Sequence, residues 1–258
     1  MYLNKKNIKF LDKGLSVIIP VYNEEKNIPH LVKKIFYYLK KINFEIIIVD
    51  DNSEDFTEKK IKQAINRYKK IKYIKRVERI RDLSKSCQLG IKKALYKNIL
   101  IMDADLQHDP KYILPMLKLF YIKKLDVVVG ARKFNNPNHL NTGQRCIRYI
   151  FSKVLVYITN IFFGVKTNDP MSGFFLFKKS LFINNEKQLY LRGYKILADM
   201  LYSPMKNIKV NDYFIRFNKR NHGISKMNMK VFFHLFFFYF AILKKIFLIK
   251  KNNSKFLF

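Results

Sequence analysis

The strongest constraint on the fold is a regular alternation of short apolar runs with longer amphipathic segments over residues 15–130. Leu15–Pro20, Phe44–Val49 and Asn98–Met102 are apolar runs rich in β-branched residues, as expected for strands that are buried on both faces of a sheet. Between the first two, Glu25–Lys41 places apolar residues at the three- and four-residue spacing of one helical face. This alternation predicts an α/β fold with a doubly wound, mainly parallel sheet flanked by helices.

The rest of the chain completes this pattern. Further strands are predicted at Ile71–Val77, Asp126–Val129, Gly173–Phe177 and Val210–Phe217. Further helices are predicted at Asp55–Lys70, at Leu83–Leu95, after the N-cap Asp109 with its following Pro110, at Gln144–Phe163, at Ile196–Tyr202 and at Lys230–Lys251. We expect one domain over residues 1–228, in two halves that meet near residue 130, and a hydrophobic, basic helix over residues 229–258.

The charge of the chain is unevenly distributed between these halves. The sequence contains 51 Lys and Arg against 19 Asp and Glu, a net charge of +32. Residues 1–110 hold 24 basic and 14 acidic side chains, whereas residues 111–258 hold 27 and 5. Such an excess indicates an anionic partner, either nucleic acid, a phosphate-bearing substrate or an anionic membrane surface. A hydrophobic content of 49% excludes an intrinsically disordered chain.

The few carboxylates gather where two strands are predicted to end. Asp50 and Asp51 follow one strand, and Asp103 and Asp105 follow another. Ligands of parallel sheets bind outside the carboxyl ends of the strands, so both clusters could face one crevice. The alternative is that these aspartates are ordinary turn residues, because Asp favours turns and caps.

The second cluster has the chemistry of a metal site. Carboxylate and amide oxygens are hard ligands that suit Mg²⁺ or Mn²⁺, and these ions commonly complete their coordination with oxygens of a bound diphosphate. The spacing of Asp103, Asp105 and Gln107 is compatible with one or two of them contacting a metal.

Three segments at these separations resemble a known family. LSVIIPVYNEEKNI, EIIIVDDNSED and ILIMDADLQHDP are similar to motifs of family 2 glycosyltransferases, which have the Rossmann-like GT-A fold and transfer a sugar from a nucleotide sugar. RDLSKSCQLG, VVVGAR, NDPMSGFFLFKKS, LRGYKIL and KRNHGISKMNMK resemble the polyprenol-phosphate (dolichol-phosphate) mannosyltransferase branch. The resemblance covers roughly residues 14–230 and implies a nucleotide-sugar half over about 1–130 and an acceptor half over about 131–228.

The resemblance also implies site residues. The expected contacts to the nucleotide sugar are Pro20, Tyr22, Glu24, Asp50, Asp51, Asp103 and Ala104. The expected metal ligands are Asp103, Asp105 and Gln107. The expected contacts to the acceptor phosphate are Arg132, Arg145 or Arg148, and Ser172. Asp105 and Arg132, with Arg220 and Lys226 as a clamp on the diphosphate, form the expected catalytic set.

Some positions depart from the family pattern. Phe175 stands where certain relatives have Arg, and Val210, Asn211 and Asp212 stand where many have Glu-Val-Pro. These departures leave the metal motif intact and leave the identity of the sugar open.

The function implied is inverting, metal-dependent transfer of a hexose, in the first place mannose from GDP-mannose, to a polyprenyl or dolichyl phosphate. A phosphate monoester has a second pKa of about 6 and is largely a dianion near neutral pH, so it needs no strong general base. One alternative is a lipid-phosphate glucosyltransferase that uses UDP-glucose. Another is a family 2 transferase acting on a saccharide, with Asp169 as the candidate base.

A nucleic-acid binder is the less favoured alternative from another class, so we expect no nucleic-acid partner. Its footprint would be the 11 basic residues between Lys59 and Arg81. No recognisable nucleic-acid module accompanies that run, and a solvated helix face accounts for it.

Because the expected acceptor is a lipid phosphate, we expect part of the chain to contact a membrane. Val231–Leu243 is a continuous apolar run of 13 residues, short of the roughly 20 that a span needs. We expect a peripheral or shallowly inserted C-terminal helix at the cytoplasmic membrane face, together with Gln144–Phe163, anchored by Lys and Arg at anionic lipid. The alternative is that both segments are core helices.

Overall fold

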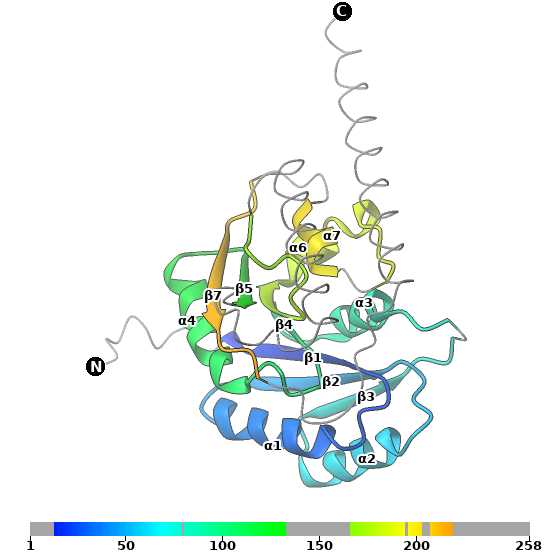
Figure 1. Ribbon diagram of the computed structural model, residues 1–258. Coiled ribbons are helices and arrows are strands. Elements are labelled where there is room, and N and C mark those ends of the chain that lie inside the picture. The colour runs from blue at the N-terminus through cyan, green and yellow to red at the C-terminus, as the bar shows by residue number, and fades with distance from the viewer. Residues whose placement is uncertain (1–12, 79, 133–165, 194–195, 203–206, 219–258) are drawn as a thin grey trace, which may run out of the picture.

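The computed structural model describes residues 13–78, 80–132, 166–193, 196–202 and 207–218. In these ranges the chain forms a seven-stranded sheet between two layers of helices (Figure 1). The strands are β1 (Leu15–Val21), β2 (Phe44–Asp50), β3 (Ile71–Lys75), β4 (Asn98–Met102), β5 (Val127–Arg132), β6 (Phe174–Lys178) and β7 (Val210–Ile215). The helices are α1 (Ile28–Leu39), α2 (Thr57–Arg67), α3 (Leu83–Lys93), α4 (Ile113–Ile122), α6 (Lys179–Ile183) and α7 (Ile196–Tyr202), with 3-10 turns η3 (Pro110–Tyr112) and η5 (Glu186–Gln188).

The sheet is mainly parallel, as predicted. Its strand order is β3-β2-β1-β4-β6-β5-β7, and the pairs β2–β3, β1–β2, β1–β4 and β5–β7 are parallel. Strand β6 runs antiparallel to both of its neighbours, β4 and β5. The sequence did not reveal this reversal, because Phe174–Phe177 is buried throughout and an unbroken apolar run has the same pattern in either direction.

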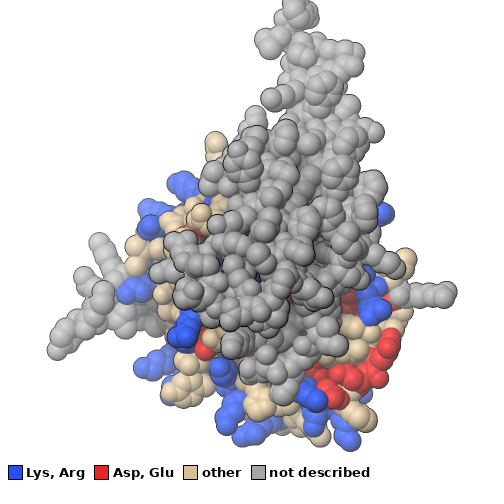
Figure 2. Space-filling model, in the orientation of Figure 1, with Lys and Arg blue, Asp and Glu red and all other residues tan. Residues whose placement is uncertain are grey.

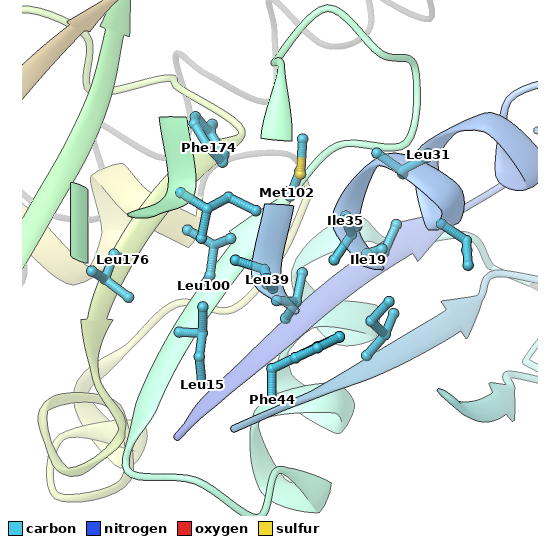
Figure 3. Close-up of a cluster of buried hydrophobic side chains, with 14 of the residues drawn as sticks. Leu15, Ile19, Leu31, Ile35, Leu39, Phe44, Leu100, Met102, Phe174 and Leu176 are labelled. Carbon is cyan, nitrogen blue, oxygen red and sulfur yellow. The ribbon is translucent and has the colours of Figure 1, made fainter. Parts of the chain in front are cut away.

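Alternate strand residues enter two separate cores. Leu15, Val17 and Ile19 of β1 pack with α1, α2 and α4, whereas Ile18 packs with α3 and α7 on the other face. Figure 3 shows the first core, where Leu31 and Ile35 of α1 lie over the sheet. Burial on both faces explains why the central strands β1, β2 and β4 are mostly apolar.

Helix α3 lies close to the sheet because it carries a glycine where it crosses β1. A Cβ atom at Gly90 would lie only 2.6 Å from Cγ2 of Ile18. Glycine at this position therefore allows α3 to pack directly against β1.

The predicted start of the fourth helix is confirmed. Oδ1 of Asp109 accepts a hydrogen bond of 3.0 Å from the backbone nitrogen of Lys111, with Pro110 in the first turn, and η3 leads directly into α4. The predicted helices at 144–163 and 230–251, and the expected boundary at residue 228, lie outside the described residues. Among the helices that are described, none has both the length and the hydropathy that crossing a bilayer requires.

Candidate functional site

The loops after β1 and β2 are joined to each other at the carboxyl edge of the sheet. The backbone nitrogen of Asn23 donates to Oγ of Ser53 at 2.9 Å, and Oδ1 of Asn23 accepts from the nitrogen of Glu54 at 2.9 Å. Asn23 and Asn52 have φ of +54° and +62°, a left-handed conformation that Asn tolerates better than most residues. The two loops therefore form one polar unit, which contains the predicted nucleotide contacts Tyr22, Glu24 and Asp51.

Asp50 stabilises this polar unit from its buried side through hydrogen bonds. It is fully buried, and its Oδ1 accepts hydrogen bonds from both the backbone nitrogen and the hydroxyl of Ser53, at 2.9 and 2.6 Å. Its Oδ2 accepts from the hydroxyl of Tyr73 at 3.0 Å. Burial, together with this carboxylate, raises the pKa of Tyr73. Asp50 thus shapes the loop, and its predicted contact to a nucleotide stays a prediction.

Asp51 belongs to a buried ionic network that the sequence did not indicate. Its Oδ1 lies 2.5 Å from Nη1 of Arg76, and its Oδ2 accepts from the backbone nitrogen of Asp82 at 2.8 Å. The same Nη1 donates to the carbonyl of Asp82 at 2.9 Å. Burial raises the pKa of Asp51, and the charge of Arg76 partly opposes this. Arg76 is one of the basic residues between Lys59 and Arg81, but it is buried and pairs with a carboxylate.

Asp82 connects this network to a distant loop. Its Oδ1 caps α3 by accepting from the nitrogen of Lys85 at 3.2 Å, and its Oδ2 accepts from the nitrogen of Gly193 at 2.9 Å. Gly193, which belongs to the motif that begins at Leu191, is therefore held beside the predicted nucleotide loops.

The predicted metal ligands lie on the loop after β4, residues 103–108, here called the metal loop. The backbone nitrogen of Asp103 donates to the carbonyl of Gly173 at 3.1 Å, next to the start of β6. A Cβ atom at Gly173 would lie 1.9 Å from Oδ2 of Asp103. Glycine is therefore required for the carboxylate to occupy this position.

The metal loop contains a strained residue between two predicted ligands. Leu106 is buried and has a φ of +61°, a conformation that costs a non-glycine residue about 1–2 kcal/mol. The backbone nitrogen of Gln107 donates to Oδ1 of Asp105 at 3.1 Å across this turn. Such strain clusters at functional sites, where the surrounding structure maintains it.

The donor set fits a hard divalent cation. The described residues contain no group of three or more His, Cys, Asp or Glu side chains that could hold a metal by themselves. Asp103 and Asp105 would need completion by Gln107 and by oxygens of a bound diphosphate, as Mg²⁺ and Mn²⁺ accept. Nε2 of Gln107 donates to the carbonyl of Asn218 at 3.3 Å, so Oε1 is the amide atom suited to a metal.

His108, which follows Gln107, is a site residue that the sequence analysis overlooked. Its ring lies 5.3 Å from the ring of Phe174, nearly parallel to it, and 5.1 Å from that of Phe217. Burial, together with the charge of Arg132, lowers the pKa of His108 to about 3. The imidazole is therefore neutral at physiological pH, and it contacts two aromatic rings. The sequence feature that could have identified His108 was its position within the acidic motif.

Arg132, at the end of β5, forms the best-defined charged pair of the site. Its Nε lies 2.7 Å from Oδ2 of Asp169, and its Nη2 lies 2.7 Å from Oδ1. Burial alone would lower the pKa of Arg132, but Asp169 and then Asp103 outweigh this effect, and the pKa is raised. Because both carboxylate oxygens of Asp169 bind Arg132, this residue is poorly placed to act as the base that a saccharide acceptor would need.

The other predicted contacts are placed as follows. Pro20 lies within β1, and Ala104 is buried on the metal loop. The ring of Tyr22 lies under the guanidinium of Arg81, 4.3 Å from it. Oε2 of Glu24 accepts from the side chain of Asn27 at 2.6 Å.

The hydroxyl of Ser172 forms hydrogen bonds with the backbone. It is buried, its Oγ donates to the carbonyl of Gly130 at 2.8 Å, and it accepts from the nitrogen of Phe174 at 3.2 Å. Its predicted contact to a phosphate is not tested by this geometry. Arg145, Arg148, Arg220 and Lys226 lie outside the described residues.

The surface of the described part carries both charges. In the view of Figure 2, Lys and Arg side chains are spread around the visible part of the described surface, while most of the visible acidic side chains gather at the lower right.

Solved structures share this architecture. Glucosyl-3-phosphoglycerate synthase from Mycobacterium tuberculosis, in complex with Mn²⁺, uridine diphosphate and phosphoglyceric acid, superposes with a TM-score of 0.64 at 15% identity, covering 85% of this chain and 74% of that one. The same enzyme with Mn²⁺ and UDP-glucose gives a TM-score of 0.61 at 15% identity, covering 87% and 78%. At this identity the likeness establishes the GT-A-like fold.

Curated relatives are similar in sequence. Dolichol-phosphate mannosyltransferase of Pyrococcus furiosus is 33% identical over 221 residues, or 85% of this chain and 60% of that protein. Dodecaprenyl-phosphate galacturonate synthase of Rhizobium johnstonii is 28% identical, over 82% of this chain and 61% of that protein. Dolichol-phosphate mannosyltransferase of Mycosarcoma maydis is 29% identical, over 84% and 75%. The chain thus spans about three fifths of the length of the first two.

The family model that matches the chain is glycosyl transferase family 2, over residues 16–185. This match contains the two polar loops, the metal loop, Arg132 and Asp169. Together with the sheet order and the arrangement at its carboxyl edge, it confirms the resemblance drawn from the motifs. The chain belongs to glycosyl transferase family 2.

Proposed function

We propose that this chain transfers a hexose from a nucleotide sugar to a polyprenyl or dolichyl phosphate, with inversion and with a divalent metal. The observation that carries the proposal is the position of the Arg132 guanidinium. It is fixed by Asp169 at the carboxyl edge of the sheet and is close enough to Asp103 for that charge to raise its pKa. The names of the relatives, which include two dolichol-phosphate mannosyltransferases, support this acceptor class.

The chemistry requires two anions to meet. The acceptor phosphate is already a nucleophile, so its oxygen can attack the anomeric carbon directly, and a single displacement inverts that carbon. Arg132 orients the acceptor, because a bidentate partner holds the guanidinium plane at one angle. Mg²⁺ or Mn²⁺, held by Asp103, Asp105 and Gln107, would supply charge neutralisation at the departing diphosphate. We assign Arg220 and Lys226 to the same diphosphate.

The sugar we propose first is mannose from GDP-mannose. UDP-glucose is the second candidate, because Phe175 and Asp212 depart from the family pattern. In the structure Asp212 accepts from the backbone and side-chain nitrogens of Asn168, at 2.8 and 2.6 Å, so this departure serves the loop that carries Asp169.

A panel assay tests this function. The protein is incubated with polyprenyl phosphate, Mg²⁺ or Mn²⁺, and GDP- and UDP-sugars in turn, and the glycolipid is identified by mass spectrometry. We expect a mannosyl phospholipid from GDP-mannose and no product with a metal chelator. A product formed from UDP-glucose alone would replace GDP-mannose as the proposed donor. Transfer to a saccharide and not to polyprenyl phosphate would overturn the proposed acceptor.

We further propose that residues 229–258 bind the cytoplasmic face of an anionic membrane. A variant that ends near Lys230 should leave the membrane fraction and lose activity toward long-chain lipid phosphate. If the shortened protein stays membrane-bound, this segment is not the anchor.

A further inference from the structure

One phenylalanine beyond β7 contacts two parts of the site at once. The ring of Phe217 meets the ring of His108 at 5.1 Å, with an angle of 71° between the planes. The guanidinium carbon of Arg132 lies 5.4 Å from the same Phe217 ring. His108 belongs to the metal loop and Arg132 ends β5, so Phe217 contacts groups from a loop and from a strand that are separate in the sequence.

The backbone holds the same segment against the metal loop. The nitrogen of Asn218 donates to the carbonyl of Gln107 at 2.9 Å, and Nε2 of Gln107 donates to the carbonyl of Asn218 at 3.3 Å. The residue after Phe217 therefore binds the residue before His108. This pairing orients the amide of a predicted metal ligand.

Phe217 is a poor candidate for a core residue. Its side chain is 36% exposed, and it belongs to neither hydrophobic core of the described residues. His108, in contrast, is buried between Phe174 and Phe217, and its Nδ1 has no hydrogen-bond partner in the described part of the chain. Ring contacts therefore help to place the imidazole, and Phe217 provides one of them.

We propose that Phe217 is a positioning residue, whose ring sets the metal loop at a fixed distance and angle from Arg132. The inference rests on the proposed function, in which the metal loop serves the donor and Arg132 serves the acceptor. In-line displacement requires both phosphates in one geometry, and small misplacements cost large factors in rate. Groups that orient metal ligands from outside typically contribute about 10–100-fold in affinity or activity.

Three variants of the full chain separate positioning from packing. Phe217→Leu keeps apolar volume and removes the flat ring, whereas Phe217→Tyr keeps the ring. Phe214→Leu is the matched control, because Phe214 lies on β7 itself and is 48% exposed. For each variant, kcat and KM for donor and acceptor, the melting temperature, and the affinity for Mn²⁺ with GDP or UDP are measured.

We expect Phe217→Leu to lower kcat by about 10–100-fold while Phe217→Tyr retains most of it. The melting temperature of Phe217→Leu should stay within a few degrees of that of Phe214→Leu, whose kcat should remain near the original value. Equal kcat for the two leucine variants would overturn the proposal. The proposal would also be overturned if the fall in kcat of Phe217→Leu were explained by a matching fall in its melting temperature.

The affinity for Mn²⁺ keeps this proposal distinct from the proposed function. If the unaltered protein transfers nothing to polyprenyl phosphate, the proposed function fails. Affinity for Mn²⁺ with the nucleoside diphosphate that is about tenfold weaker in Phe217→Leu would still support positioning by Phe217. Unchanged affinity in that case would overturn it.

Discussion

Arg132 and Asp169 form a bidentate ion pair in which Nε and Nη2 of the arginine each lie 2.7 Å from a carboxylate oxygen. The two residues are 37 positions apart in the sequence. Asp169 is almost completely buried, whereas the Arg132 side chain is 29% exposed. The carboxylate is thus the fixed partner, and it determines which way the cation faces.

Removing this carboxylate should misplace Arg132. We expect Asp169→Asn to lower kcat/KM for polyprenyl phosphate by about 10–100-fold, because an outer partner orients the binding group. Asp212→Asn is the matched control, since Asp212 binds the same 167–168 loop without contacting Arg132. Equal losses of kcat/KM in both variants would mean that the conformation of the loop, and not the ion pair, determines the activity.

The metal assignment predicts different results for two aspartates that lie four positions apart, Asp105 and Asp109. Asp105→Asn should abolish most metal-dependent transfer, because it removes a charged ligand. Asp109→Asn should retain it, because Asn caps a helix about as well as Asp. A radiolabelled-sugar assay over a range of Mn²⁺ concentrations checks both. Full metal-dependent activity in Asp105→Asn would refute the assignment.

Gly173 should be required for metal binding. A Cβ atom there would lie 1.9 Å from the carboxylate of Asp103, so Gly173→Ala must displace this side chain. We expect the affinity for Mn²⁺, measured by titration calorimetry with nucleotide present, to fall about tenfold or more. Gly193→Ala is the control, because its Cβ would meet nothing within 4 Å, although its φ of +77° makes the variant somewhat less stable. Similar metal affinity in the two variants would contradict the expectation.

A surface carboxylate on α2 should contribute stability that depends on pH. Glu58 accepts hydrogen bonds from Lys62 and Lys75, which lower its pKa from 4.5 to about 2. Because the folded pKa lies below the unfolded one, the stabilisation is present above pH 4.5 and is lost as the pH falls toward 2. Melting curves of Glu58→Gln should therefore differ from those of the original protein at pH 6 and converge with them in strong acid. A difference independent of pH would show that charge is not the cause.

The motifs predicted which residues share a loop at the carboxyl edge of the sheet, but not the partners of their side chains. Asp51 was expected to bind a nucleotide or the metal region, and the structure shows it paired with Arg76, the residue that directly follows β3. Ser172 was expected near phosphate, and its hydroxyl is used by the backbone of Gly130. Spacing along a chain records which residues share a loop, whereas these pairings depend on which loops meet.

By itself the sequence determined the α/β class, the positions of the seven described strands, the N-cap at Asp109 and the glycosyltransferase family. These follow from local periods, caps and motifs, which a one-dimensional pattern carries. Only the tertiary structure decided the reversed direction of β6, the pairing of Arg132 with Asp169, and the contact of Phe217 with His108. The physical reason is that strand direction inside a fully apolar sheet, and the partner of a buried charge or ring, depend on contacts between segments that are far apart in the chain.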